Sequence, residues 1–155
     1  MLVHDLSLFG RVACAAGLGY VVGWEREVRG HAAGARTLST VSAGAAAFTV
    51  IAVDAFAPTA EKLIAGIVTG IGFLGAGIVL RGRHTSVKGL TTAATIWVVA
   101  AVGVAAGAGR FVLAALTTAL QLVVLELRAI PVLRHLDPGR SSHRFTDDAE
   151  RAEPP

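Results

Sequence analysis

Charged side chains that could act together lie at the end of the first apolar run, in Trp24-Glu25-Arg26-Glu27. Two carboxylates at this spacing can hold Mg²⁺ only weakly and through water, because this ion prefers oxygen ligands and keeps several of its waters. Glu25 and Arg26 can pair with basic residues at the starts of later runs, and threonines there can cap helix N-termini. We therefore expect a polar network with no direct metal ligands, formed by Glu25, Arg26, Glu27, Arg36, Thr37, Lys88, Thr91 and Thr92. The alternative is a solvated cluster that anchors helix ends.

The sequence lacks the motifs of known catalytic, cofactor-binding and metal-binding sites. Gly70, Gly72 and Gly75 match the dinucleotide-binding pattern GxGxxG, but they lie in an apolar run, and about 20 residues further on stands Thr95 where a carboxylate is needed. The sequence has no paired-cysteine, HExxH, P-loop or GxSxG motif, and its five histidines are scattered. We therefore predict no catalytic residue, no enzyme activity, no cofactor and no protein-built metal site.

The elements that position these residues are predicted to be membrane-spanning helices. The chain has 155 residues, of which 54% are hydrophobic and 16% are charged, so it is too apolar for an ordinary water-soluble surface. A helix needs about 17 to 25 apolar residues to cross a bilayer. Five runs come close to or reach that length, which predicts an all-α polytopic membrane protein with spans at about 6–23, 38–57, 63–80, 90–109 and 111–127.

Three polar residues within or beside these runs have simple interpretations. Arg11 would cost about 2.5 to 3.5 kcal/mol at the bilayer centre, but it lies near the start of its run, so we expect it to reach the lipid headgroups. Asp54 is expected at the membrane interface. Cys14, the one cysteine, is expected to be a small thiol on a helix face, and it excludes a disulfide-built scaffold.

Connections rich in lysine and arginine alternate with connections that carry only one such residue. This alternation predicts the orientation of the chain. By the positive-inside rule, the N-terminus lies outside and the C-terminus in the cytoplasm. We interpret the net charge of +3 as orientation charge, with lipid as the surroundings and no nucleic acid partner. The predicted transmembrane domain covers 1–134, followed by a disordered cytoplasmic tail at 135–155. The inner side carries Arg26, Arg29, Arg36, Arg81, Arg83, Lys88 and the arginines after 127, whereas the outer connections carry Lys62 and Arg110.

Glycines are dense inside the predicted spans, although each costs about 1 kcal/mol relative to alanine in a water-exposed helix. In lipid, pairs spaced four residues apart let helix backbones approach closely. A local unwinding of the third span, with carbonyls lining a cavity, is an open alternative. We expect a compact glycine-rich bundle in which packing and interaction depend on Gly19, Gly23, Gly66, Gly70, Gly72, Gly75, Gly77, Gly103 and Gly107.

Four segments, taken in order, resemble the MgtC/SapB family of membrane proteins over roughly Cys14 to Arg134. They are Gly17-Leu-Gly-Tyr-Val-Val-Gly-Trp-Glu-Arg-Glu, Ala33-Gly-Ala-Arg-Thr, Thr69-Gly-Ile-Gly-Phe-Leu-Gly-Ala-Gly and Lys88-Gly-Leu-Thr-Thr-Ala-Ala-Thr-Ile-Trp97. The chain departs from the family pattern at Lys88, where arginine is usual, and at Ala35, where leucine is usual.

The resemblance implies a bacterial inner-membrane protein linked to growth at low magnesium and, in pathogens, to survival inside macrophages. It also implies a short member without a C-terminal cytoplasmic domain. The membrane part of the F-type ATP synthase is the partner it suggests, and a homodimer is the alternative. Two functions are therefore in view: a non-enzymatic regulator that binds a membrane complex through helix faces, and a permease for Mg²⁺ or another small ion.

Overall fold

The computed structural model describes residues 1–79 and 89–126, and the secondary structure in these ranges is entirely helical. The expected all-α fold is therefore confirmed. Lys88 and the predicted tail at 135–155 lie outside the described residues. The elements, in chain order, are α1 (Leu2–Val28), α2 (Ala35–Ala55), the 3-10 turn η1 (Ala57–Thr59), α3 (Ala60–Val79), α4 (Leu90–Gly107) and α5 (Phe111–Glu126).

Four helical segments in the described ranges are long and apolar enough to cross a membrane: α1, α2, η1 with α3, and α4. The fifth, α5, is apolar but shorter, at 16 residues. Helix α1 extends beyond the predicted run at both ends, because a helix continues through polar residues at its termini whereas an apolar run stops at them. The last turn of α1 therefore carries the Glu25-Arg26-Glu27 segment.

Glycines in the left-handed conformation end or precede several of these helices. Gly30 follows α1 with φ 73°, and Gly109 separates α4 from α5 with φ 76°. Other residue types rarely adopt such angles, so these positions favour glycine. Pro58 lies in η1 at the start of the α3 segment, where its missing N–H costs nothing.

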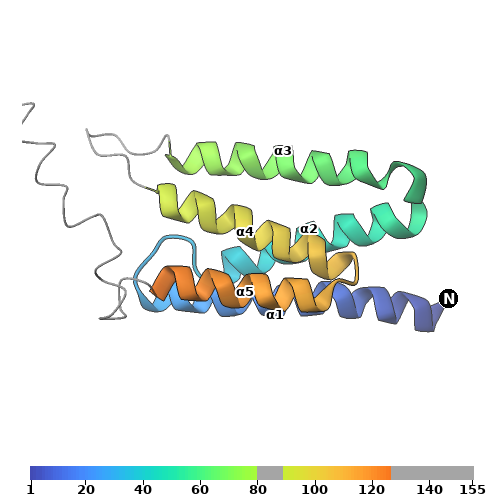
Figure 1. Cartoon of the computed structure of the whole chain (residues 1–155), viewed down its shortest axis with the longest axis horizontal. Coiled ribbons are helices and arrows are strands. Elements are labelled where there is room, and N and C mark those ends of the chain that lie inside the picture. Colours follow the sequence, from blue (N-terminus) through green and yellow to red (C-terminus); the bar gives the residue numbers. More distant parts are fainter. Residues whose placement is uncertain (80–88, 127–155) are drawn as a thin grey trace, which may run out of the picture. The chain divides into compact units, whose positions relative to one another are not determined.

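Residues Met1–Leu122 form one compact unit, in which α2 packs against both α1 and α4 (Figure 1). A second unit starts at Val123, and its described part is the end of α5. Within the first unit the core is made mainly of small side chains. Ala15, Ala46, Val102, Ala106 and Ala114 are fully or almost fully buried together. Small residues bring helix backbones close enough for dispersion contacts to hold a bundle in lipid.

Two of the predicted glycine pairs pack on α2 from different helices. A Cβ at Gly19 of α1 would lie 2.6 Å from the Leu38 carbonyl oxygen. A Cβ at Gly107 of α4 would lie 2.6 Å from the Ala46 carbonyl oxygen. Gly23 and Gly103, the other member of each pair, also face α2 with no room for a side chain. The backbone of α2 therefore fills the space left by both pairs.

Helix α3 is different, because it lies at one edge of the bundle and buries little of its surface (Figure 1). Gly75 is its buried residue, and a Cβ there would make an ordinary 3.7 Å contact with the Ala93 Cβ. Around Gly66, Gly70, Gly72 and Gly77 no other atom would lie within 4 Å of an added Cβ. The helix is continuous from Ala60 to Val79, so the alternative of a local unwinding here is wrong.

Candidate functional site

Three arginines, Arg26, Arg29 and Arg36, lie where α1 ends and α2 begins, which we call the basic end. Arg26 lies in the last turn of α1 and is only 3% exposed. Its Nη2 donates a hydrogen bond to Thr92 Oγ1 in α4 at 3.1 Å, and its buried Nε has no hydrogen-bond partner. The structure therefore brings together two members of the predicted network, Arg26 and Thr92.

Glu25 pairs with a neighbour on its own helix. Its Oε1 lies 2.5 Å from Arg29 Nε, one turn along α1. Side chains four residues apart meet on a helix surface, so Glu25 and Arg29 pair within α1 and need no contact with α2. The expected pairing of Glu25 or Arg26 with Arg36 is therefore wrong. Arg36 and Thr37 are exposed on the first turns of α2, and Lys88 lies outside the described residues.

Glu27 has a structural role that the sequence did not indicate. Its Oε2 accepts a hydrogen bond from the Ala35 backbone N–H at 2.9 Å, so α1 caps the N-terminus of α2. Gly34 lets the carboxylate approach, because a Cβ there would lie 2.7 Å from the same oxygen. The expected threonine caps are wrong, because the residues before α2 and α4 are glycines and the threonines lie inside the helices. A carboxylate at a helix N-terminus also offsets the helix dipole.

Replacing Glu27 by alanine is expected to lower the free energy of unfolding by about 1 kcal/mol, because an orphan N–H and a favourable dipole contact are lost. Glu27→Gln, which keeps an acceptor oxygen, should lose less. Unfolding of the purified protein in detergent, followed by circular dichroism, measures both values. Equal stability of Glu27→Ala and the wild type would show that the cap contributes nothing.

Glu25 and Glu27 therefore point to different partners and do not form a shared carboxylate site. Across the described ranges no group of three or more histidine, cysteine, aspartate or glutamate side chains could hold a metal ion. The network at the basic end, as far as it is described, is a set of helix-positioning contacts around one buried guanidinium. It contains no arrangement of nucleophile and base.

Sequence reasoning missed a second polar contact deeper in the bundle. Gln121 of α5 is buried and its Nε2 donates to Thr95 Oγ1 at 3.3 Å. The Thr95 hydroxyl in turn donates to the Thr91 carbonyl at 2.8 Å. The signal was present, because Gln121 is the one amide inside the last apolar run. A polar side chain buried in lipid is expected to hydrogen-bond across helices, so this contact ties α5 to α4.

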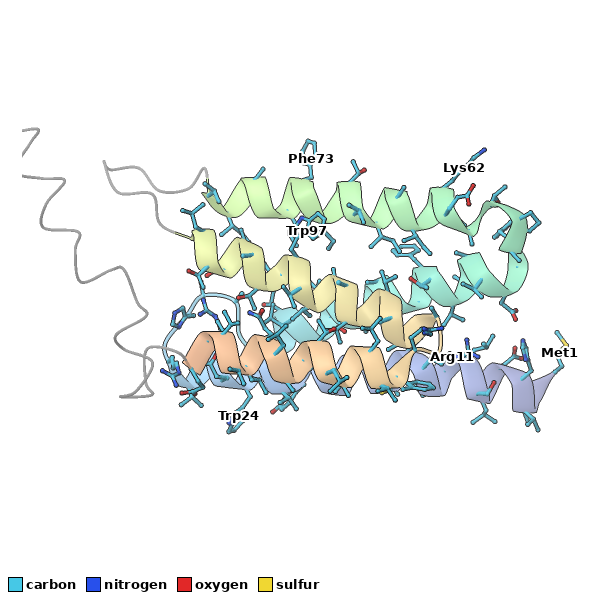
Figure 2. The ribbon with its side chains drawn as sticks, viewed as in Figure 1. Met1, Arg11, Trp24, Lys62, Phe73 and Trp97 are labelled. Atoms are coloured by element: carbon cyan, nitrogen blue, oxygen red, sulfur yellow. The ribbon has the colours of Figure 1, made fainter. Side chains whose placement is uncertain are left out.

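Arg11 makes a contact within the bundle that the sequence did not indicate. Its Nη1 donates to the Gly107 carbonyl oxygen at 3.2 Å, at the C-terminus of α4 (Figure 2). The last carbonyls of a helix lack partners and carry a partial negative charge, which a guanidinium satisfies. His4 Nε2 lies 2.8 Å from Asp54 Oδ1, so Asp54 joins α2 to α1.

A groove of about 550 Å³ runs between α2 and α3, and its walls are almost entirely apolar. Glycines from both helices open it, because they leave no side chain to fill the space. Trp24 and Phe73 are exposed and do not line the groove, and Figure 2 shows both side chains pointing away from the bundle. The groove is lined by Gly44, Phe48 and Phe56 on one side and by Leu63, Gly66 and Gly70 on the other.

Comparison with known proteins connects this architecture to a family. Protein MgtC of Brucella abortus is 45% identical over 119 residues, which cover 74% of this chain and 50% of that protein. A protein of Haemophilus influenzae is 34% identical over 151 residues, covering 91% of this chain and 63% of its own length. YhiD of Escherichia coli, whose name proposes a magnesium transporter, is 36% identical over 129 residues, covering 77% of this chain and 57% of YhiD.

The chain thus spans half to two thirds of the length of these relatives. No solved structure matches it. Residues 12–131 match the MgtC family, a range that takes in both glycine pairs packed on α2, the exposed glycines of α3 and the basic end. This chain, whose described helices include four segments long and apolar enough to cross a membrane, belongs to the MgtC family.

Proposed function

We propose that this protein is a non-enzymatic regulator in the bacterial inner membrane, linked to magnesium homeostasis, and that it acts by binding a transmembrane helix of another membrane protein. The proposed contact is the free face of α3, defined as Gly66, Gly70, Phe73 and Gly77. These residues follow one another at spacings of four, three and four, so they share one side of the helix. Phe73 is 85% exposed.

The observation that carries the proposal is that glycine pairs of the same spacing are packed against α2 in two helices but are unpacked in α3. Gly19 with Gly23 and Gly103 with Gly107 are each filled by the backbone of α2. Gly66 and Gly70 have the same spacing, but no atom of another helix would contact a Cβ at either. Since lipid supplies no hydrophobic force between helices, close backbone packing is what such a pair offers to a partner.

The occupant we propose is a helix from a membrane complex, and the family resemblance suggests the membrane part of the F-type ATP synthase. A second copy of this chain is the other outcome to be distinguished. We further propose that the basic end faces the cytoplasm, as the positive-inside rule requires. The direct test is capture of the tagged full-length protein from native membranes, beside a Gly70→Leu variant. One membrane subunit retained by the wild type and lost by the variant supports the proposal, whereas identical retention by both contradicts it.

Transport of Mg²⁺ is the competing function, and the name of YhiD favours it. The route left open by the sequence was a set of carbonyls released by Gly70 to Gly77, but α3 is a continuous helix to Val79, so the carbonyls from Gly70 to Gly75 are used within it. The last two spans and α3 after Glu61 also carry no carboxylate before Glu126. We therefore expect no Mg²⁺ flux above background in proteoliposomes of the purified protein. Sustained flux that scales with protein content would make the permease the better account.

A further inference from the structure

The N-terminus of α4 presents backbone donors that the described residues do not use. Gly89 precedes the helix in the left-handed conformation, with φ 93°, and no side chain caps it. The N–H of Ala93 is the first to bond back, to the Gly89 carbonyl at 2.9 Å. The N–H groups of Leu90, Thr91 and Thr92 thus have no acceptor within the described ranges, and they carry the positive end of the helix dipole.

Arg26 is directed at the same place from α1. Its Nη2 reaches Thr92 Oγ1, in the first turn of α4, and its Nε is buried with no partner. A guanidinium has five N–H donors and is always charged. Among the described residues no carboxylate lies within ion-pair distance of it, since the neighbouring Glu25 pairs with Arg29. Glu25 attracts the Arg26 charge, but no described carboxylate bonds to the guanidinium, and a buried N–H without a partner is costly, so this arrangement favours an anion.

The helix N-terminus and the guanidinium are both positive, and the Thr92 hydroxyl that accepts a bond from Arg26 carries no charge to offset them. Phosphate oxygens satisfy both, because they accept bonds from backbone N–H groups and match the planar fork of arginine. We propose that Arg26 and the first turn of α4 bind a phosphate-bearing anion. Its source is a phospholipid headgroup or inorganic phosphate, and both present the same chemistry to these donors. The site lies on α1 and α4 and does not depend on the role proposed for α3.

Binding assays on the full-length protein, freed of lipid in a maltoside detergent, separate the two sources. One arm titrates inorganic phosphate by calorimetry, and the other counts retained phosphatidylglycerol by native mass spectrometry. We expect one bound anion per chain in at least one arm. Arg26→Gln should weaken binding about tenfold or more, because a charge-assisted contact is lost. Arg36→Gln, which removes an exposed charge from the same end, should stay within about twofold of the wild type. Absence of binding in both arms, or equal affinity of Arg26→Gln and the wild type, would overturn the proposal.

Arg26→Gln could instead prevent folding, since it alters a buried residue. Arg26→Lys keeps the charge and should retain binding in the same arm, but more weakly, since the bidentate fork is lost. A measurement on the wild type alone is independent of any variant. Magnetic dipolar coupling between guanidinium ¹⁵N and ³¹P in the lipid-reconstituted protein should be observed at Arg26. A wild-type sample in which Arg26 shows no coupling, with phosphate and phospholipid both present, would reject the site.

Discussion

Gly103→Ala is expected to destabilise the bundle by about 3 kcal/mol or more, despite the better helix propensity of alanine. The added Cβ would collide with the Ser42 carbonyl oxygen of α2 and lie 2.9 Å from the Ala45 Cβ. Backbone atoms of a packed helix cannot step aside as a flexible side chain can, so α4 must move away from α2. Unfolding in mixed micelles, followed by circular dichroism, measures the loss.

The matched control is Gly77→Ala on α3, where an added Cβ meets no atom within 4 Å. Its stability should equal or slightly exceed that of the wild type, because only the propensity term remains. If the two variants lost the same stability, the seam between α4 and α2 would not be as close as the structure describes. If neither variant lost stability, the core at Gly103 would have room for a methyl group, and the close packing described here would be wrong.

Gly66→Leu combined with Gly70→Leu is expected to abolish the protein's function while leaving its fold intact. No atom would lie within 4 Å of a Cβ at either position and both border the groove, so we expect leucine to be accommodated there. On the free face of α3, however, the two side chains would hold a partner helix away from the backbone. Complementation of a deletion strain at low magnesium should fall to the level of the empty vector, with expression and thermal stability unchanged.

Ala65→Leu provides the comparison, because it adds the same bulk to an exposed position of α3 outside the free face. It should complement as well as the wild type. Full complementation by the double variant would show that the protein's function does not need the free face of α3. A double variant that was unstable in detergent would show that the groove beside α3 is packed more tightly than it is in this structure.

The lengths of the apolar runs were enough to predict the helices, because the thickness of the bilayer fixes how many residues must be apolar. The helix ends were less predictable. Glu25, Arg26 and Glu27 follow the span predicted at 6–23, yet they still belong to α1, which ends at Val28, because helix propensity does not stop where hydropathy falls.

The partners of charged and small residues could not be predicted, because they depend on which helices become neighbours. Gly19 with Gly23 and Gly66 with Gly70 have the same spacing, but α2 fills the space beside the first pair, whereas no atom would lie within 4 Å of a Cβ added at the second, which borders the groove. Arg11 and Arg26 likewise looked like interfacial charges. Each meets an end of α4, Arg11 at the C-terminus and Arg26 at the N-terminus, which only the packing of α1 against α4 reveals.

The most direct measurement of the central claim is photocrosslinking from α3 in native membranes. Benzoylphenylalanine is placed at Phe73, on the free face, or at Leu116 of α5, which is 64% exposed and serves as a lipid-facing control. The account predicts a discrete adduct from position 73 with one identified membrane subunit, whereas an adduct with a second copy of the chain alone would replace this partner by a homodimer. The adduct should be absent from position 116 and lost on adding Gly66→Leu. Adducts with lipid alone at position 73, or the same protein adducts from both positions, would contradict a binding role for this face.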